Sequence, residues 1–246
     1  MIKFIVFCTK IVIATIVALL FTSCHTKFDF GNGIDGNGNV TTEKRNVVGD
    51  FTKIDASRGL NVEVEQSKSY FVEVEADENL HQHITTKVEN GTLIITSDEN
   101  IDESTSRTIR VKMPSIAGLE TSSGANISGK NTFLGNNLKV RSSSGSEIDV
   151  EVEIDAIDCE TTSGSTITIK GKGLTLNSAS SSGSSIDAKD LKVNDVVAQS
   201  TSGSSTDVYP IVSLNGKASS GSSVNYKYTP KTINKEESSG GSVSQE

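Results

Sequence analysis

Carboxylates recur at one position of a phrase that the second half of the chain repeats. Asp149, Asp187 and Asp207 each stand four residues after the glycine of a Ser-Gly pair. If the repeats stack as parallel strands, Asp187 and Asp207 lie on neighbouring strands about 4.8 Å apart. Two carboxylates so placed could bind a cation, or act as acid and base on a glycan. A solvated face that its charge keeps soluble is the favoured interpretation, because no Arg or Lys cluster accompanies them.

Two histidines and one cysteine are the other candidates for chemistry. His81 and His83 are one residue apart, so on a strand both point the same way and could supply two metal ligands. Neither a cysteine nor a third histidine accompanies them in sequence, and a solvated turn is favoured. Cys159 stands at an inward offset and is interpreted as a core residue rather than a catalytic thiol. The sequence therefore predicts no catalytic residue, no metal site and no cofactor.

A repeat fixes the positions of these residues. A hydroxyl residue, a serine and a glycine follow one another seven times, with glycine spacings of 21, 19, 19, 20, 18 and 19 residues. A period of about 20 residues predicts a solenoid in which each repeat forms one coil. Glycine permits a tight corner in each coil. The corner glycines are Gly124, Gly145, Gly164, Gly183, Gly203, Gly221 and Gly240.

Apolar and polar residues alternate around each corner. The residue seven before the glycine is apolar, the residue three after it is β-branched, and its immediate neighbours are small. These offsets are odd, and alternate residues of a strand share one face. The pattern predicts an all-β fold, a parallel β-helix or β-solenoid with coils of about 20 residues, stabilised by contacts between neighbouring coils. A disordered Ser/Gly linker, the alternative, would not place aliphatic residues so regularly.

The start of the chain has the features of a targeting signal. Lys3 and Lys10 give the first residues a positive charge, and an apolar run follows at 11–21 that is too short for a typical membrane helix. Thr22, Ser23 and Cys24 come next. The arrangement resembles a bacterial lipoprotein signal over residues 1–23, which implies lipidation of Cys24 and a protein anchored to a membrane of the cell envelope. An ordinary cleaved signal peptide is the alternative. Residues 24–39 are rich in Gly and Asn and predict a tether.

Residues 40–116 predict strands that cap or extend the repeat region, which covers 117–246. Alternating segments lie at 60–65, 70–75 and 108–113, and Asn90-Gly91 before the apolar run at 93–95 predicts a hairpin. Residues 77–81 could form a single helical turn. The N-terminal part is therefore expected to belong to the same β-rich body.

Several of these residues resemble a known family. Gly49-Asp-Phe51, then Gly59-Leu60-Asn61, then Pro114-Ser-Ile116 and Ser122-Ser-Gly124 are similar to the Bacteroidetes adhesin family also called the auto-transporter adhesin head GIN domain. In this chain Leu60 replaces the isoleucine of the Gly-Ile-Asn signature. The resemblance covers about residues 38–240 and implies a β-solenoid in a secreted or lipid-anchored envelope protein. It brings no catalytic residues with it.

Composition and pattern together favour a binding or scaffold role. The net charge is −8 and no basic run is present, so nucleic acid is not expected as a partner. The first hypothesis is a non-enzymatic, lipid-anchored envelope protein whose surface binds a glycan or a protein. The alternative is a glycan-active β-helix enzyme that uses the outward aspartates. A third is an envelope scaffold that binds nothing outside the cell.

Overall fold

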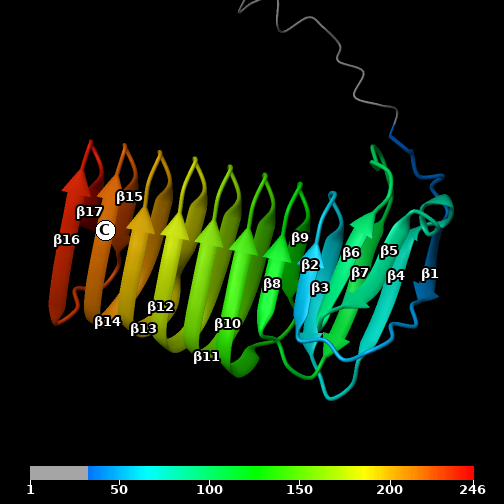
Figure 1. Cartoon of the computed structure of the whole chain (residues 1–246), viewed down its shortest axis with the longest axis horizontal. Helices are drawn as coiled ribbons and strands as arrows, with labels where there is room; N and C mark the ends of the chain where they lie inside the picture. The colour runs from blue at the N-terminus through cyan, green and yellow to red at the C-terminus, as the bar shows by residue number, and fades with distance from the viewer. Residues whose placement is uncertain (1–32) are drawn as a thin grey trace, which may run out of the picture. The chain divides into compact units, whose positions relative to one another are not determined.

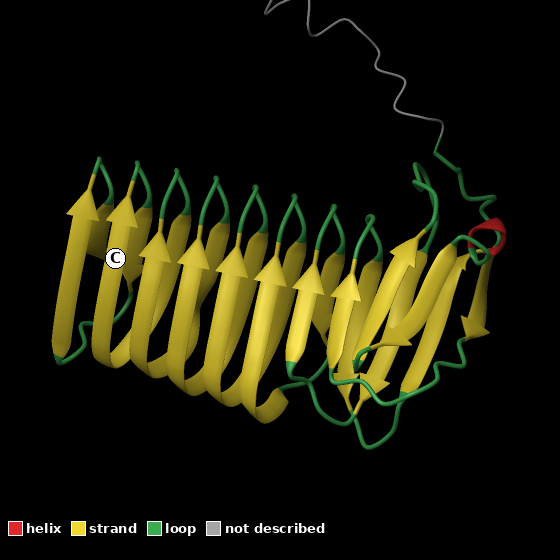
Figure 2. Ribbon diagram, in the orientation of Figure 1, coloured by secondary structure: helices red, strands yellow, loops and turns green. Residues whose placement is uncertain are grey.

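The computed structural model describes residues 33–246, and residues Ile34–Glu246 form one compact unit. This unit is a β-solenoid, as Figures 1 and 2 show, so the predicted fold class is confirmed. The predicted signal peptide and Cys24 lie outside the described residues. Within the described residues, no helix is long and apolar enough to cross a membrane. The strands and the single 3-10 helix are β1 Val40–Lys44, β2 Lys53–Ala56, β3 Asn61–Gln66, β4 Phe71–Asp77, η1 Glu78–Leu80, β5 Ile84–Glu89, β6 Thr92–Ser97, β7 Arg107–Met113, β8 Gly118–Thr121, β9 Asn126–Gly129, β10 Phe133–Ser142, β11 Glu147–Thr161, β12 Thr166–Ser180, β13 Ser185–Ser200, β14 Ser205–Ser219, β15 Ser223–Tyr226, β16 Thr232–Ser238 and β17 Ser242–Gln245.

The solenoid has two sheet faces joined along two edges. The front face of Figure 1 begins with β6, β2, β8 and β10 and ends with β16. The back face begins with β7, β3 and β9 and ends with β17. The long strands β11 to β14 run from the back face around a rounded edge into the front face, so each belongs to both. At the other edge, here called the corner edge, the Ser-Gly pairs form the row of loops along the top of Figure 1.

Aliphatic side chains stack in continuous columns inside the coils. On the back face, Ile148 pairs with Ile127 and Ile167, and Ile167 pairs with Ile186. On the front face the column runs through Leu138, Ile157, Leu176, Val196, Leu214 and Ile233. All of these except the last are buried. The odd offsets therefore face inward, and each coil buries its apolar residues against the next one.

At each of the seven repeat corners, both the serine and the glycine adopt left-handed backbone conformations. At the third corner, Ser163 has φ 56° and Gly164 has φ 70°. Positive φ at both central positions is the geometry of a type I′ turn, in which the chain reverses within two residues. The glycine N–H donates to the serine carbonyl of the next coil, as from Gly164 to Ser182 at 3.1 Å. The turns thus continue the hydrogen-bonded ladder of the strands along the corner edge.

A hydroxyl network fills the interior beside these corners. The Ser180 hydroxyl lies 2.9 Å from those of Ser200 and Thr206 and 3.0 Å from that of Ser204. All four side chains are buried. Thr206 occupies a position that is aliphatic in the other six repeats, and its hydroxyl completes this cluster. Buried hydroxyls that satisfy one another avoid the cost of unpaired polar groups.

The N-terminal part caps the solenoid and contains a corner that the repeat count missed. Arg58 and Gly59 have φ 59° and 68°, and Gly59 N–H donates to the Ser123 carbonyl at 2.9 Å. Arginine replaces the usual serine there. After β3 the chain passes to one side of this coil, where β6 and β7 pair in parallel with β2 and β3, and it then crosses to the other side at β8. The intervening strands add antiparallel pairs, β1 with β4, β4 with β7, and the predicted hairpin β5 with β6. The predicted helical turn is η1.

Gly38 is held against this cap by one carboxylate. Asp77 is buried, and it accepts hydrogen bonds from the backbone N–H groups of Gly38, Thr105 and Ser106. Burial raises the pKa of Asp77, but these amide hydrogen bonds outweigh it and hold the pKa below its usual value. The C-terminal coil is closed by charged groups instead: Glu237 accepts from Val243 N–H at 2.6 Å, and Lys235 donates to the Val243 carbonyl at 2.7 Å.

The corner geometry predicts a cost for adding a side chain at Gly164. A Cβ there would meet no heavy atom within 4 Å, so left-handed strain alone should act. We expect Gly164→Ala to destabilise the solenoid by about 1–2 kcal/mol, measured as a lower urea midpoint. Ser163→Asn is the control, because Asn tolerates positive φ, and its midpoint should stay close to that of the wild type. An unchanged midpoint for Gly164→Ala would show that the left-handed corner is not maintained.

Candidate functional site

The predicted aspartates lie in one row on the outside of the back face. Asp149 pairs with Thr168, Thr168 with Asp187, and Asp187 with Asp207. Asp187 and Asp207 are therefore neighbours on β13 and β14, while Thr168 separates Asp149 from both. The pairing places two carboxylates side by side on an outer sheet face.

Each of the two adjacent carboxylates has a partner of its own. Lys189 Nζ lies 2.8 Å from Asp187 Oδ2, and Asn225 Nδ2 donates to Asp207 Oδ1 at 2.7 Å. Asp187 raises the pKa of Lys189 by hydrogen bonding and by charge, with Asp207 adding to the effect. The lysine offsets the charge of the pair, so this arrangement suits a stable outer face better than a shared proton or a cation.

Asp149 lies in a small depression farther along the same face. The depression measures about 120 Å³ and is also lined by Lys130, Asn131, Glu151 and Lys170. Gly129 lies at its edge against Phe133, whose ring a Cβ would approach to 3.1 Å. The volume suits a few waters rather than a ligand.

The two histidines do not converge on a common point. His81 is buried, and its Nε2 lies 3.0 Å from the Thr41 hydroxyl. His83 instead contacts Asp98 through Nδ1 at 2.9 Å and Gln82 through Nε2 at 3.1 Å. Among residues 33–246, no three His, Cys, Asp or Glu side chains form a group that could hold a metal ion. The pair therefore serves local packing and turn structure.

Cys159 is a core residue of β11. Its side chain is fully buried and forms no disulfide. Burial, with a smaller contribution from the Asp158 carboxylate, raises the pKa of its thiol to about 12. A thiol that does not ionise near neutral pH is a poor nucleophile.

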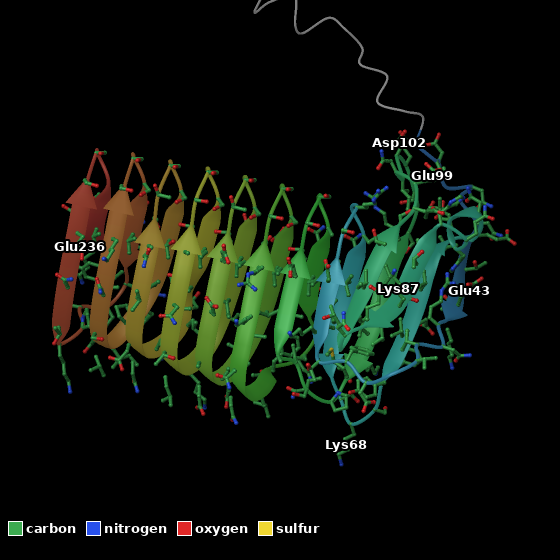
Figure 3. The ribbon with its side chains drawn as sticks, viewed as in Figure 1. Glu43, Lys68, Lys87, Glu99, Asp102 and Glu236 are labelled. Carbon is green, nitrogen blue, oxygen red and sulfur yellow. The ribbon has the colours of Figure 1, made fainter. Side chains whose placement is uncertain are left out.

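A further hollow lies on the front face, next to the corner edge. It is a groove of about 750 Å³ that crosses the coils from β11 to β16. One row of outward residues is in register along it: Glu160, Ala179, Gln199, Lys217 and Glu236. A second row consists of the hydroxyl residues Ser181, Thr201, Ser219 and Ser238. Figure 3 labels Glu236 on β16, at the C-terminal end of the groove.

Ion pairs flank a neutral middle section of this groove. Arg141 Nε lies 3.0 Å from Glu160 at one end, and Glu160 raises the pKa of Arg141. Lys217 Nζ lies 3.0 Å from Glu236 at the other end. Between them stand Ala179 and Gln199, one small and one an uncharged donor and acceptor. The middle of the groove can therefore accept an extended polar partner without displacing a charge pair.

Sequence reasoning found the inside of the coils but missed the groove. Its floor depends on Ala179, which takes an outward position where neighbouring repeats carry Glu160 and Gln199. A small residue in a polar row was the only signal, and the repeat pattern gave no reason to single it out. A second depression of about 330 Å³ lies around Gly118, where burial raises the pKa of Asp55.

Comparisons with known proteins agree with this architecture. The family model described as putative auto-transporter adhesin, head GIN domain, matches residues 50–230. A crystal structure of a putative adhesin from Bacteroides fragilis is 19% identical and superposes with a TM-score of 0.81, covering 87% of this chain and 100% of the other. A crystal structure of a putative adhesin from Parabacteroides merdae is 20% identical and has a TM-score of 0.70, with the alignment covering 88% of this chain and 100% of the other. A crystal structure of a putative lipid binding protein from Parabacteroides distasonis is 21% identical and has a TM-score of 0.66, with the alignment covering 87% of this chain and 99% of the other. At these identities the likeness shows the fold, and no curated protein matches the chain.

The burial of Cys159 predicts that its thiol does not react with reagents while the protein is folded. In a chain with Cys8→Ser and Cys24→Ser, Cys159 is the sole cysteine. We expect it to resist a thiol-specific reagent at pH 8 and to react fully in denaturant, because its pKa of about 12 keeps it protonated and its burial excludes the reagent. Adding Ser163→Cys at an exposed corner gives the control, which should react at once. Rapid native labelling of Cys159 itself would contradict the core assignment.

Proposed function

The chain belongs to the auto-transporter adhesin head GIN domain family, and on this premise we propose that it is a non-enzymatic binding protein of the bacterial cell envelope. Lipid chains on Cys24 hold it to a membrane, and the tether that follows lets the solenoid reach a glycan or protein partner. Two of the crystal structures with the same fold are of putative adhesins, which supports binding as the role of the fold.

The front-face groove is the observation that carries the binding role. It is lined mainly by hydroxyl, amide and charged side chains, with Ala179 and Ala218 as its apolar members. Such a lining offers many hydrogen-bond donors and acceptors at the regular spacing of the coils, about 4.8 Å. An extended polymer with repeated polar groups, such as a glycan chain or a polar peptide segment, fits this surface.

The geometry of the candidate catalytic groups supports a role without catalysis. On the outer face Asp187 is paired with Lys189 and Asp207 accepts a hydrogen bond from the Asn225 amide, and Cys159 is buried. A glycosidase needs one carboxyl whose pKa is raised by its surroundings and a cleft that holds the sugar between two acids. Release of reducing ends from a polysaccharide, lost in the double variant Asp187→Asn and Asp207→Asn, would overturn this part of the proposal.

The sequence around Cys24 supports the lipid anchor. We expect the protein made in its bacterial host to incorporate a labelled fatty acid, and Cys24→Ser to abolish the label, because the thiol is the acylated group. The matched control is Cys8→Ser, which should keep the label, since residue 8 lies within the removed segment. Labelling of the Cys24→Ser protein would refute anchoring at this residue.

The groove can be tested by filling it. Ala179→Arg places a long cation on the floor between the two ion pairs, and we expect binding to the partner to weaken about ten-fold. Partners are sought among envelope polysaccharides, host matrix proteins and whole bacterial cells, and binding is measured by retention on the immobilised protein. Thr168→Arg is the control, because it adds the same charge to the back face.

Two results would count against this proposal. Equal binding by wild type and Ala179→Arg would remove the groove as the binding surface. If the protein bound no member of the three partner classes, and deletion of its gene left adhesion unchanged, the binding role itself would be wrong.

A further inference from the structure

Two tyrosines stack on the outside of the C-terminal coils, away from the groove. Tyr209 lies on β14 and Tyr228 follows β15, and their ring centroids are 5.6 Å apart with an interplanar angle of 3°. The chain contains only four tyrosines and no tryptophan. The other ring pair described, Phe51 with Tyr70, closes the core, because Phe51 is buried. Tyr228 by contrast is 48% exposed.

The stack leaves one ring face for a ligand. Lys192 pairs with Tyr209 in the strand register, and its Nζ lies 6.0 Å from the Tyr209 centroid. Tyr209 is therefore flanked by Lys192 on one side and by Tyr228 on the other. Tyr228 has Tyr209 against one face, and half of its surface is open to solvent. The open aromatic face of the pair thus belongs to Tyr228.

The residues on either side of Tyr228 are fixed by hydrogen bonds. Lys227 Nζ lies 2.8 Å from Asp190 on β13, so this ion pair reaches across the coil that contains Tyr209. The Lys227 N–H donates to the Val208 carbonyl at 3.0 Å. Thr229 donates from its hydroxyl to Gln245 at 2.9 Å. The chain on both sides of Tyr228 is therefore fixed, the ring itself is held by its stack on Tyr209, and an ammonium and a hydroxyl belong to the adjacent residues. A preformed site loses little conformational entropy when a ligand binds.

The chemistry of this site favours a sugar over other ligands. A pyranose ring has an apolar C–H face that packs on an aromatic ring, and hydroxyls at its rim that need hydrogen-bond partners. A protein hot spot needs an apolar surface that excludes water, whereas Lys227 and Thr229 flank this ring. A cationic ligand would be repelled by Lys192, which already lies over the Tyr209 ring, while the Lys227 charge is balanced by Asp190. We propose that Tyr228, positioned by Tyr209, is a platform on which a pyranose ring of a polysaccharide stacks.

This inference deepens the proposed function, because it names a glycan as a partner, and it uses a surface separate from the groove. The test uses the full chain in detergent with dextran, xylan and alginate as soluble probes, which differ in sugar and in charge. Without tryptophan, the fluorescence of the protein comes from its tyrosines, so stacking on Tyr228 should change the emission directly. Affinity electrophoresis in gels containing each polysaccharide gives an independent measure.

We expect Tyr228→Ala to weaken binding of the retained polysaccharide about ten-fold and Tyr228→Phe to restore it, because the ring face makes the contact. Tyr209→Ala should weaken binding less, since it acts by positioning Tyr228. Leu134→Ala removes an exposed side chain at the other end of the same coil column and should change nothing. Circular dichroism and the urea midpoint verify that each variant is folded.

Several outcomes would overturn the platform. The first is that Tyr228→Ala binds the polysaccharide as tightly as the wild type does. The second is that Tyr228→Phe loses as much affinity as Tyr228→Ala, and the third is that none of the three polysaccharides retains the wild type. A protein partner that depends on Tyr228 while no glycan binds would assign the site to protein recognition instead. If Ala179→Arg loses a partner while Tyr228→Ala weakens the binding of none of the three polysaccharides, the platform fails and the proposed function stands. If the wild type binds no partner at all, both fail.

Discussion

The turn at the corner edge is the constraint on which the solenoid depends. Two consecutive left-handed residues reverse the chain within one type I′ turn. The glycine N–H of every turn except the last donates to the serine carbonyl of the neighbouring coil at 2.9–3.1 Å. Because this bond joins successive turns, it sets their separation and keeps them in one column. The strands that leave each corner then start in register. The aliphatic columns, the hydroxyl network and the outer rows all follow from that alignment.

Alignment of the coils also determines what the surface can do. Residues at equivalent offsets from the corner glycines lie side by side, so each outer row consists of one residue from each successive coil. Where the row contains Arg141 beside Glu160, or Lys217 beside Glu236, charges compensate each other. Where it contains Ala179 and Gln199, the groove opens between the ion pairs. A rigid face with such a row holds its binding groups in place before the partner arrives, which lowers the entropic cost of binding.

The two proposed binding surfaces differ in the chemistry they offer. The groove presents hydroxyl, amide and charged groups along several coils, and suits many weak polar contacts with an extended polymer. The Tyr209–Tyr228 stack presents one aromatic face with a few fixed polar groups, and suits a single ring. They lie on opposite faces of the same coils. A polysaccharide could therefore be bound at either surface independently, and variants at one should leave the other intact.

The sequence by itself determined the repeated part of the protein, because a period of about 20 residues with inward odd offsets has one compact solution, stacked β-coils. It placed Ile148 and Ile167 in one column, Cys159 in the core, and Asp187 beside Asp207. It could not place Arg58–Gly59 among the corners, since arginine replaces the serine and the next corner, Ser123–Gly124, lies far outside the period of about 20 residues. Only the tertiary structure decided which outer residues meet. Lys227 with Asp190 and Tyr209 with Tyr228 depend on side-chain reach between coils, which no spacing along one strand encodes.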